Sequence, residues 1–290
     1  MSARRSRRTV VLLIAVAALA TACAPQSDGG NNAGTSNSPT ASGTSTASAS
    51  TDACAKDSLQ TFAPGKLTLA TDKPENGKGF EGAVAAAVAQ KLGYTPDEVT
   101  WTRVGFNSVF KPTPKNWDFD INEFSITEQR KQAVDFSSGY YDVSQAVVTT
   151  KGSKADGVTT VAGLKKLTLG AQVGTTSYQA ITDQIAPSAK PRVYNSNNDV
   201  VKALENGQID ALVTDLPTAF YMAAAQLDHG KIVGQLPSGT GTPEQFGLVL
   251  DKGSPLTTCV SQAVDALRAD GTLAALTDQW LSQQGAPVLK

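Results

Sequence analysis

Histidine, cysteine and methionine are scarce in this chain of 290 residues, which contains one, three and two of them respectively. The single histidine, His229, lies in the turn-like sequence DHGK, and a turn residue is the better interpretation of it. The sequence contains no metal-ligand spacing, phosphate-binding loop or nucleophile elbow. These absences argue against an enzyme, and we expect neither a metal nor another cofactor.

Positive charge is not in excess either. The chain has 25 basic and 26 acidic side chains, and 21 basic ones remain once the four arginines within residues 1–22 are removed. The remainder carries a net charge near −5 and shows no basic patch, which argues against nucleic acid as a partner.

The N-terminal segment is typical of a secretory signal. Four arginines precede the apolar run Val10–Ala20, and small residues follow it up to Cys23. The run is shorter than the roughly 20 residues that span a bilayer. We therefore predict a signal peptide at residues 1–22 and an exported protein, and Ser6-Arg7-Arg8 leaves twin-arginine export open.

Residues 23–53 are predicted to form a tether. The sequence Leu19–Cys23 resembles a bacterial lipobox, although Ala20 stands where leucine usually precedes the cysteine by three residues. We predict lipidation of Cys23, and the alternative is an ordinary cleavage site followed by an incidental thiol. Between Ala24 and Asp52 no large apolar side chain could anchor a fold, so this stretch is expected to be a disordered tether to the membrane.

The folded region alternates between short β-rich runs and helical runs, which indicates an α/β fold. The alternation begins at Lys66 and restarts after Lys151-Gly152-Ser153, which predicts two lobes of about 100 residues each. The expected strands are residues 67–71, 99–104, 119–126, 145–150, 167–173, 191–195, 209–215 and 231–236. The expected helices are residues 80–94, a helix that starts at Thr127, and residues 177–186, 198–207, 217–227, 256–269 and 271–284.

The two remaining cysteines, Cys54 and Cys259, lie near the two ends of the folded region. In an oxidising compartment we predict that they form a disulfide, and the alternative is two separately buried thiols. A bridge would return the last two helices to the first lobe. The first lobe would then comprise residues 54–150 and 242–290. The second lobe, residues 151–241, would be an insertion joined through two hinge crossings.

Five motifs together carry a resemblance to a known family. They are FEG at the first helix, DFDIN at a strand end, SITEQR followed by VDFS and YY, VGTTSY, and ALENGQIDALVTDLP. In this order and spacing, residues 65–285 resemble the extracellular solute-binding proteins of polar amino acid ABC importers. The resemblance implies the two-lobed type II periplasmic-binding fold, a monomer that binds a free amino acid by hinge closure, and ABC permease subunits as partners.

The two charges of a free amino acid point to the residues that would bind it. A cleft that dries on closure must pair both charges. Arg130 can hold the carboxylate through two parallel hydrogen bonds, with further donors at Ser125. By resemblance Asp215, at a strand-to-helix turn, accepts the ammonium. The alternatives are a surface arginine paired with Asp135 or Glu128, and an aspartate that caps a helix.

Thr127 is predicted to cap a helix, and Arg130 then lies in the first turn of that helix. A cation at this position opposes the helix dipole by roughly 0.3–1 kcal/mol. We interpret Arg130 as tolerated there because the ligand carboxylate would lie between the guanidinium and the helix end.

Further candidate contacts come from both lobes. Thr175 and Thr176 could cradle a carboxylate at a helix start, or could only cap that helix. Asp72, at the end of the first strand, has the same two interpretations as Asp215. Phe106 matches the aromatic residue that stacks on the ligand in the family, or it packs in the core. The family often has Lys-Ser-Gly-Thr where this chain has Gln172-Val173-Gly174-Thr175, so Gln172 replaces a cation and favours a ligand with a neutral polar side chain.

One departure from the family pattern lies between Asp72 and Phe80. The segment KPENGKG contains none of the aromatic residues usual there, so part of an aromatic lid is expected to be missing, and Phe80 is expected to pack inward. The rival interpretations are an enzyme of the same fold, such as a cyclohexadienyl-type dehydratase, and a ligand-sensing domain. A sensor would be expected to continue into a membrane helix and a signalling module, whereas this chain stops at Lys290.

Overall fold

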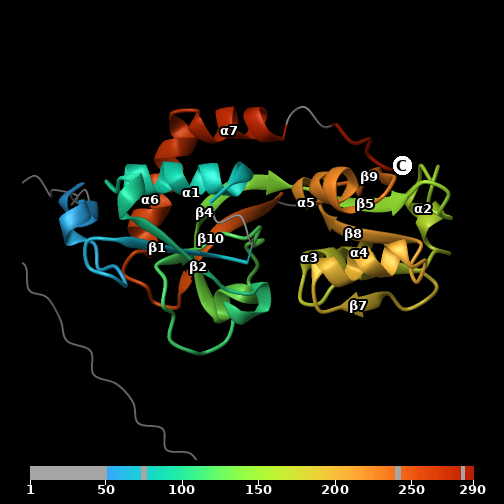
Figure 1. Ribbon diagram of the computed structural model, residues 1–290, viewed down its shortest axis with the longest axis horizontal. Helices are drawn as coiled ribbons and strands as arrows, with labels where there is room; N and C mark the ends of the chain where they lie inside the picture. The colour runs from blue at the N-terminus through green and yellow to red at the C-terminus, as the bar shows by residue number, and fades with distance from the viewer. Residues whose placement is uncertain (1–50, 73–76, 239–242, 282–284) are drawn as a thin grey trace, which may run out of the picture. The chain divides into compact units, whose positions relative to one another are not determined.

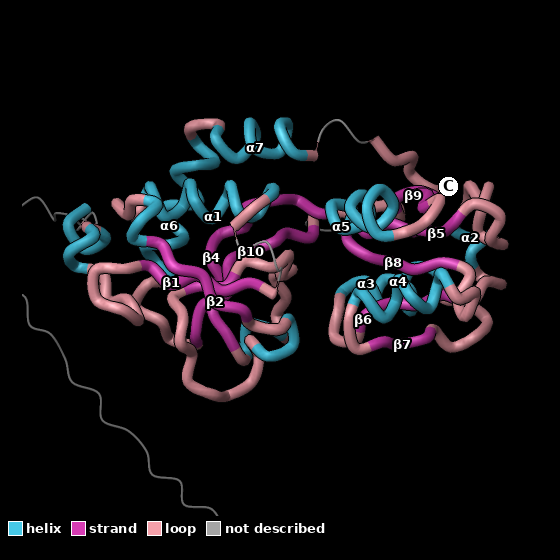
Figure 2. Tube along the Cα trace, viewed as in Figure 1, coloured by secondary structure: helices cyan, strands magenta, loops and turns pink. Residues whose placement is uncertain are grey.

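The computed structural model describes residues 51–72, 77–238, 243–281 and 285–290. These residues form two five-stranded mixed sheets with helices packed against them (Figures 1 and 2). The predicted signal peptide, the predicted lipidation site at Cys23 and most of the predicted tether lie outside the described residues. Among the residues described, no helix combines the length and the apolar character needed to cross a membrane.

The first sheet has the strand order β2-β1-β3-β10-β4. Its strands are β1 (Leu67–Thr71), β2 (Val99–Arg103), β3 (Phe119–Asp120), β4 (Val134–Val143) and β10 (Glu244–Asp251). Strand β1 runs parallel to β2 and β3, whereas β10 runs antiparallel to β3 and β4. Polar side chains that follow β1 and β3 therefore meet at the carboxyl end of the sheet, where open α/β sheets bind ligands.

Three helices cover the first sheet: α1 (Gly79–Lys91), α6 (Thr257–Ala269) and α7 (Thr272–Trp280) (Figure 1). Helix α1 buries Phe80, Val84 and Val88, which recur every four residues, as a core-facing helix requires. Phe80 packs inward against the rings of Tyr140 and Tyr141, as predicted. Three single-turn 3-10 helices link these elements: η3 (Pro96–Glu98), η4 (Phe106–Ser108) and η5 (Arg130–Gln132).

The second sheet has the strand order β7-β6-β8-β5-β9. Its strands are β5 (Gln145–Thr150), β6 (Leu169–Gln172), β7 (Arg192–Tyr194), β8 (Ala211–Asp215) and β9 (Gly230–Gln235). Its helices are α2 (Val161–Leu164), α3 (Thr176–Ala180), α4 (Asn197–Glu205) and α5 (Leu216–Tyr221), with π-helical turns η6 (Ile181–Ile185) and η7 (Met222–Gln226) continuing α3 and α5. Two separate apolar clusters build the core of this lobe, one containing Val147 and the other Val148, because successive strand residues point to opposite faces.

Strand β5 lies in the second sheet, although the division drawn from the sequence places residues 145–150 in the first lobe. It pairs antiparallel with β8 and β9. Only Ser144 separates it from β4 of the first sheet, so the chain changes sheet at that residue. The alternating pattern identifies a strand, but it carries no information about which sheet completes the hydrogen bonds of that strand.

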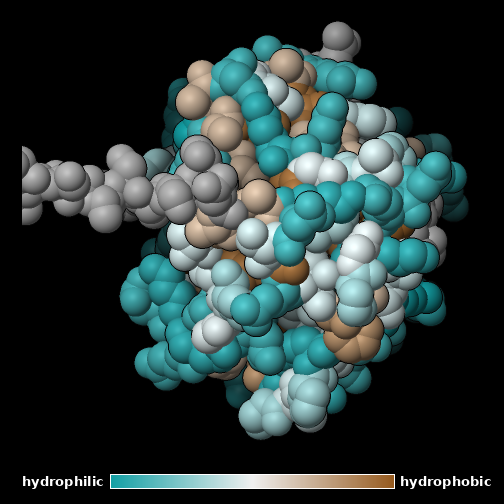
Figure 3. All heavy atoms as spheres, turned by 90° about the vertical axis from the view of Figure 1, so that its left-hand side faces the viewer, coloured by the Kyte–Doolittle hydropathy of each residue, from teal (hydrophilic) through white to brown (hydrophobic). Residues whose placement is uncertain are grey.

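The predicted disulfide is present between Cys54 and Cys259. It joins η1 (Thr51–Cys54), which is followed by η2 (Lys56–Ser58), to helix α6. The start of the described region is thereby attached to the core of the first lobe. Hydrophilic residues cover most of the molecular face in Figure 3, and hydrophobic residues lie between them in small groups.

Residues 285–290 return to the second sheet. The amide of Leu289 donates to the carbonyl of Gln235 (2.9 Å), and the amide of Gln235 donates to the carbonyl of Pro287 (2.7 Å). The Leu289 side chain is 3% exposed and packs in the core of the second lobe. These contacts cover the edge strand β9 with the end of the chain.

Replacing Leu289 by alanine is expected to lower the free energy of unfolding by about 2–3 kcal/mol, because a buried side chain would leave a cavity. Urea unfolding followed by circular dichroism measures this change. Val288, which is 59% exposed, supplies the matched control, since Val288→Ala should change stability little. Equal effects of the two substitutions would contradict the role given to Leu289.

Candidate functional site

The segment that carries Arg130 differs from the predicted helix. Thr127 accepts a hydrogen bond from the Arg130 amide through its hydroxyl (3.1 Å), as a cap does. However, only the single 3-10 turn η5 follows before β4 begins at Val134. The helix predicted to start at Thr127 is therefore wrong. A single turn has too few aligned peptides for a substantial dipole, so the predicted electrostatic cost of Arg130 does not arise.

The Arg130 guanidinium connects the two lobes. Its Nη1 donates to the carbonyl of Ser125 (2.8 Å) and its Nη2 donates to the carbonyl of Gly174 in the second lobe (3.0 Å). The charged group lies 5.4 Å from the ring centre of Phe106 and 5.3 Å from that of Phe110. Aromatic faces and carbonyl oxygens stabilise a cation without neutralising it, so the positive charge of Arg130 persists in the site.

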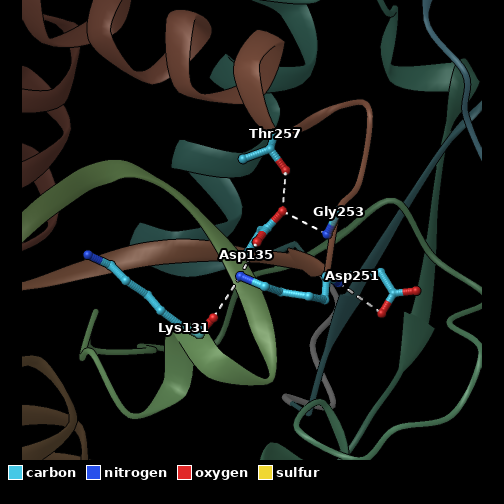
Figure 4. A network of polar contacts seen from close by, with 6 residues as sticks. Lys131, Asp135, Asp251, Gly253 and Thr257 are labelled. Carbon is cyan, nitrogen blue, oxygen red and sulfur yellow. Dashed lines mark hydrogen bonds and ion pairs between the residues drawn. The ribbon is translucent and has the colours of Figure 1, made fainter. Parts of the chain in front are cut away.

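The alternative partners considered for Arg130 are engaged elsewhere. Asp135 accepts hydrogen bonds from Lys252 Nζ (2.9 Å) and from the amide of Gly253 (2.9 Å), and Figure 4 shows it between Gly253 and Thr257. Although burial opposes it, the hydrogen bonds of Lys252 and Gly253 hold the pKa of Asp135 below its ordinary value. Glu128 pairs with Lys131 at 2.8 Å. The interpretation of Arg130 as a surface arginine paired with Asp135 or Glu128 is therefore wrong.

A network of polar side chains continues from Arg130 to Asp215. The Ser125 and Thr176 hydroxyls lie 3.2 Å apart across the two lobes. Gln145 Nε2 lies 3.3 Å from the Thr176 hydroxyl and 2.6 Å from Asp215 Oδ1. The same nitrogen lies 3.1 Å from Glu244 Oε2. The structure thus brings together a cation and two carboxylates, linked by hydroxyl and amide groups.

Asp215 occupies the N-cap position of α5, but its side chain makes no capping hydrogen bond. The carboxylate instead accepts from Gln145. The capping alternative for the Asp215 side chain is therefore wrong, and the carboxylate faces the polar network.

The electrostatics of the site are dominated by carboxylates. Burial raises the pKa of Asp215 well above its ordinary value, and the negative charges of Glu123 and Glu244 add to this, against the opposing effects of Gln145 and Arg130. Burial lowers the pKa of Arg130, while Asp215 and Glu244 act in the other direction. Burial, Glu123 and other acidic neighbours raise the pKa of the Tyr141 hydroxyl to about 12. Among the described residues, burial and the neighbouring carboxylates therefore both oppose ionisation of Asp215.

Three further predicted site residues, Thr175, Gln172 and Phe106, contact residues of their own lobes. The Thr175 hydroxyl accepts from the Tyr178 amide (3.2 Å) and donates to the Gln172 carbonyl (2.8 Å), so it caps α3 as the plainer interpretation proposed. Gln172 is buried at the end of β6. Phe106 stacks on Phe124 with ring centres 4.8 Å apart, so it packs in the lobe and also supports Arg130.

Asp72 follows the end of β1, where its carbonyl accepts from Arg103 Nε (3.1 Å). The segment that was expected to lack part of an aromatic lid includes residues 73–76, which lie outside the described residues. His229 lies in a turn with φ of 56°, which agrees with the turn interpretation.

Four residues of the site were not identified from the sequence: Glu123, Tyr141, Gln145 and Glu244. Gln145 opens β5 directly before three apolar residues, and a polar residue at the point where the chain changes sheet is the only local signal. Tyr141 contacts the rings of Phe80 and Phe246. These side chains come from different strands and loops, so only the tertiary structure places them together.

Asp120, at the end of β3, is a buried acid outside this network. It is 0% exposed, its strand partners Ala70 and Val249 are also buried, and neither of its carboxyl oxygens has a hydrogen-bond partner within the described part of the chain. Burial, with the charges of Asp72 and Glu81, raises its pKa well above the ordinary 3.8.

Replacing Asp120 by valine is expected to raise the free energy of unfolding at pH 7 by about 1–3 kcal/mol, because an unpaired buried acid is removed. The native state holds the Asp120 proton more tightly than the unfolded state does, so wild-type stability should fall as pH rises from 3.8 through the raised pKa. The stability of Asp120→Val should not show this contribution to the decrease with rising pH. Urea unfolding between pH 4 and pH 7 measures both effects.

Asp118 provides the control, since it is also a buried aspartate but accepts from the amides of Phe62 (2.7 Å) and Thr68 (2.6 Å). Asp118→Val should destabilise the protein because two amides lose their partner. A loss of stability in Asp120→Val would contradict the prediction.

Comparison with known proteins gives matches over most of the chain. The bacterial extracellular solute-binding proteins, family 3, match residues 60–283. The glutamine-binding protein of an ABC transporter from Bacillus subtilis (strain 168) is 28% identical over 218 residues, which are 73% of this chain and 77% of that protein. An arginine-binding protein of an ABC transporter from Escherichia coli (strain K12) is 29% identical over 211 residues, 71% of this chain and 82% of that protein.

Two solved structures share the fold. An ancestral arginine-binding protein bound to arginine is 31% identical with a TM-score of 0.61, over 75% of this chain and 98% of that one. An ancestral amino acid-binding protein, described as a precursor of cyclohexadienyl dehydratase, is 30% identical with a TM-score of 0.60, over 74% of this chain and 95% of that one. These likenesses confirm the predicted two-lobed architecture.

Proposed function

The chain belongs to the bacterial extracellular solute-binding proteins of family 3, and from this premise we propose that it binds a free polar amino acid for an ABC importer. The observation that carries the proposal is the polar network in which Arg130 and Asp215 face one site from different lobes. Relatives that bind glutamine and arginine for ABC transporters support the class of ligand.

The two fixed charges match the two ends of a free amino acid. Arg130 would receive the carboxylate through its planar fork, with the Ser125 and Thr176 hydroxyls as further donors. Asp215 would receive the ammonium, held in position by Gln145. Both charges of the ligand are then paired inside a site that is closed to water, which is the condition for burying them at low cost.

Contacts that cross between the lobes support closure around the ligand. Arg130 donates to the carbonyl of Gly174, and the Ser125 hydroxyl lies 3.2 Å from that of Thr176, so each contact joins one lobe to the other. A ligand that pairs with Arg130 and Asp215 at once binds this closed form better than an open form and shifts the equilibrium toward it. The permease would recognise the closed form.

The remaining parts of the proposal concern attachment and assembly. Lipidation of Cys23 would anchor the protein to the outer face of the cell membrane through the tether. The folded body would act as a monomer on the ABC permease subunits. Palmitate labelling of the wild type, absent in Cys23→Ala, tests the anchor.

An enzyme remains the second candidate because one solved relative is described as a precursor of a dehydratase. Incubation with cyclohexadienyl acids, followed by detection of the aromatic product, separates the two functions. A binding protein should give no product above the rate without protein.

Calorimetric titration of the purified protein with each of the twenty amino acids tests the proposed function. We expect saturable binding of one amino acid or a chemically related group, together with a rise in melting temperature. Binding by none of the twenty would overturn the proposal.

A further inference from the structure

One hydrogen bond joins the two lobes outside the contacts proposed for the ligand. The hydroxyl of Thr218, in the first turn of α5, donates to Glu123 Oε2 at 2.5 Å. Glu123 lies between β3 and η5 of the first lobe, whereas α5 lies in the second lobe. A threonine has one hydroxyl proton, and this contact uses that of Thr218. The negative charge of Glu123 contributes to the raised pKa of Asp215, so the contact lies beside the polar network.

The backbone of Glu123 is held in an uncommon conformation by the first lobe. Its φ of 52° is left-handed, which is rare for a residue other than glycine. Its amide donates to Glu81 Oε1 at 2.5 Å, and the Tyr140 hydroxyl donates to the same oxygen at 2.6 Å. Glu81 on α1 and Tyr140 on β4 are both buried. Strained conformations of this kind persist where the surrounding structure fixes them, and they cluster at functional sites.

Thr218 is held by the second lobe. Pro217, which is buried, occupies the first turn of α5, where its restricted φ suits the start of a helix. Ala219 is fully buried in the apolar cluster that contains Val148. Thr218 itself is β-branched, which restricts its χ1 angle. Because each partner is held by its own lobe, rotation of the lobes apart would lengthen the hydrogen bond, and an added separation of about 1 Å is sufficient to break it.

We propose that the hydrogen bond between Thr218 and Glu123 stabilises the closed arrangement of the lobes, and that Thr218 raises the affinity for the ligand through closure rather than by touching the ligand. The inference rests on the proposed function and adds to it a residue that controls the closed fraction. A ligand that binds the closed form has an apparent affinity proportional to that fraction. Loss of this hydrogen bond therefore weakens binding even though every ligand contact remains.

Replacing Thr218 by valine removes the hydroxyl and nearly preserves the shape of the side chain. The Kd should rise about tenfold, which is the typical effect of losing one hydrogen bond to a carboxylate. Thr218→Ser keeps the hydroxyl, and its affinity should stay within threefold of the wild type. Calorimetric titration of the full chain with each of the twenty amino acids measures these affinities for those that the wild type binds.

Another threonine of the second lobe supplies the matched control. Thr182 is exposed, and its hydroxyl donates to the carbonyl of Gln179 (2.8 Å) in the same lobe. Thr182→Val makes the same chemical change, but the hydrogen bond that it removes does not join the lobes. The affinity of this variant should equal that of the wild type. Melting temperatures without ligand show whether each variant is folded.

A double-mutant cycle separates the contact from a general effect of Thr218 on α5. In a Glu123→Ala background the Thr218 hydroxyl has lost its acceptor, so Thr218→Val should cause less than a twofold further loss of affinity. A tenfold loss from Thr218→Val in both backgrounds would show that Thr218 acts by another route, and it would overturn the inference.

The remaining outcomes distinguish the inference from the function on which it rests. An affinity of Thr218→Val within twofold of the wild type would overturn the inference and leave the proposed function intact. Equal losses in folded Thr218→Ser and Thr218→Val would do the same, because the hydroxyl would not be the cause. Binding of none of the twenty amino acids by the wild type would overturn the inference and the proposed function together.

Discussion

Replacing Arg130 by alanine is expected to weaken amino acid binding at least thirtyfold. The ligand carboxylate would enter the closed site without its counter-charge, and truncating one partner of a buried charge pair costs about 2–5 kcal/mol. Arg130→Lys should lose most of the affinity as well, because an ammonium cannot reproduce the two parallel hydrogen bonds of the guanidinium. Isothermal titration calorimetry with the ligand found for the wild type measures both losses.

The control for Arg130 is Arg192, which is exposed on β7 of the second sheet. Arg192→Ala removes the same charge from the protein and should leave the affinity unchanged. Arg130 also bridges Ser125 and Gly174, so the melting temperature of unliganded Arg130→Ala shows whether the fold persists. An affinity of Arg130→Ala within twofold of the wild type would exclude the proposed carboxylate contact.

Replacing Asp215 by asparagine is expected to have two effects of opposite sign. Binding should weaken at least thirtyfold, because the ligand ammonium loses its counter-charge. Stability without ligand should rise, because Glu123 and Glu244 no longer repel a third carboxylate and asparagine can still accept from Gln145. Calorimetry and thermal unfolding measure the two effects separately. Loss of both binding and stability would point to a purely structural role.

The raised pKa of Asp215 also predicts how the affinity for the ligand depends on pH. Its pKa in the unliganded protein lies well above the ordinary value, and the ligand ammonium favours the ionised form, so binding should release a proton when the pH is below that raised pKa. The affinity should fall as the pH is lowered through it. Titrations in two buffers with different ionisation enthalpies detect the released proton. Asp228→Asn, an exposed change, should leave the pH dependence as in the wild type.

The sequence interpretation and the structure agree where a short stretch of chain is sufficient evidence. The position of Asp215 at the end of a strand and the packing of Phe80 into the first lobe were both predicted, because each depends on the residues immediately around it. The helix at Thr127 was wrong because β4 begins only four residues after Arg130, so competition from sheet pairing ended the helical turn. Local propensity alone does not include that competition.

The sequence by itself determined the alternation of strands and helices, the disulfide between Cys54 and Cys259, and the two opposite charges suited to an amino acid. Only the tertiary structure decided that β5 joins the second sheet and that Glu123, Gln145 and Glu244 meet Asp215. Periodicity and caps arise from contacts within a few residues. In contrast, the nitrogen of Gln145 meets carboxylates 70 and 99 residues further along the chain, and that meeting depends on the order of strands in the sheets.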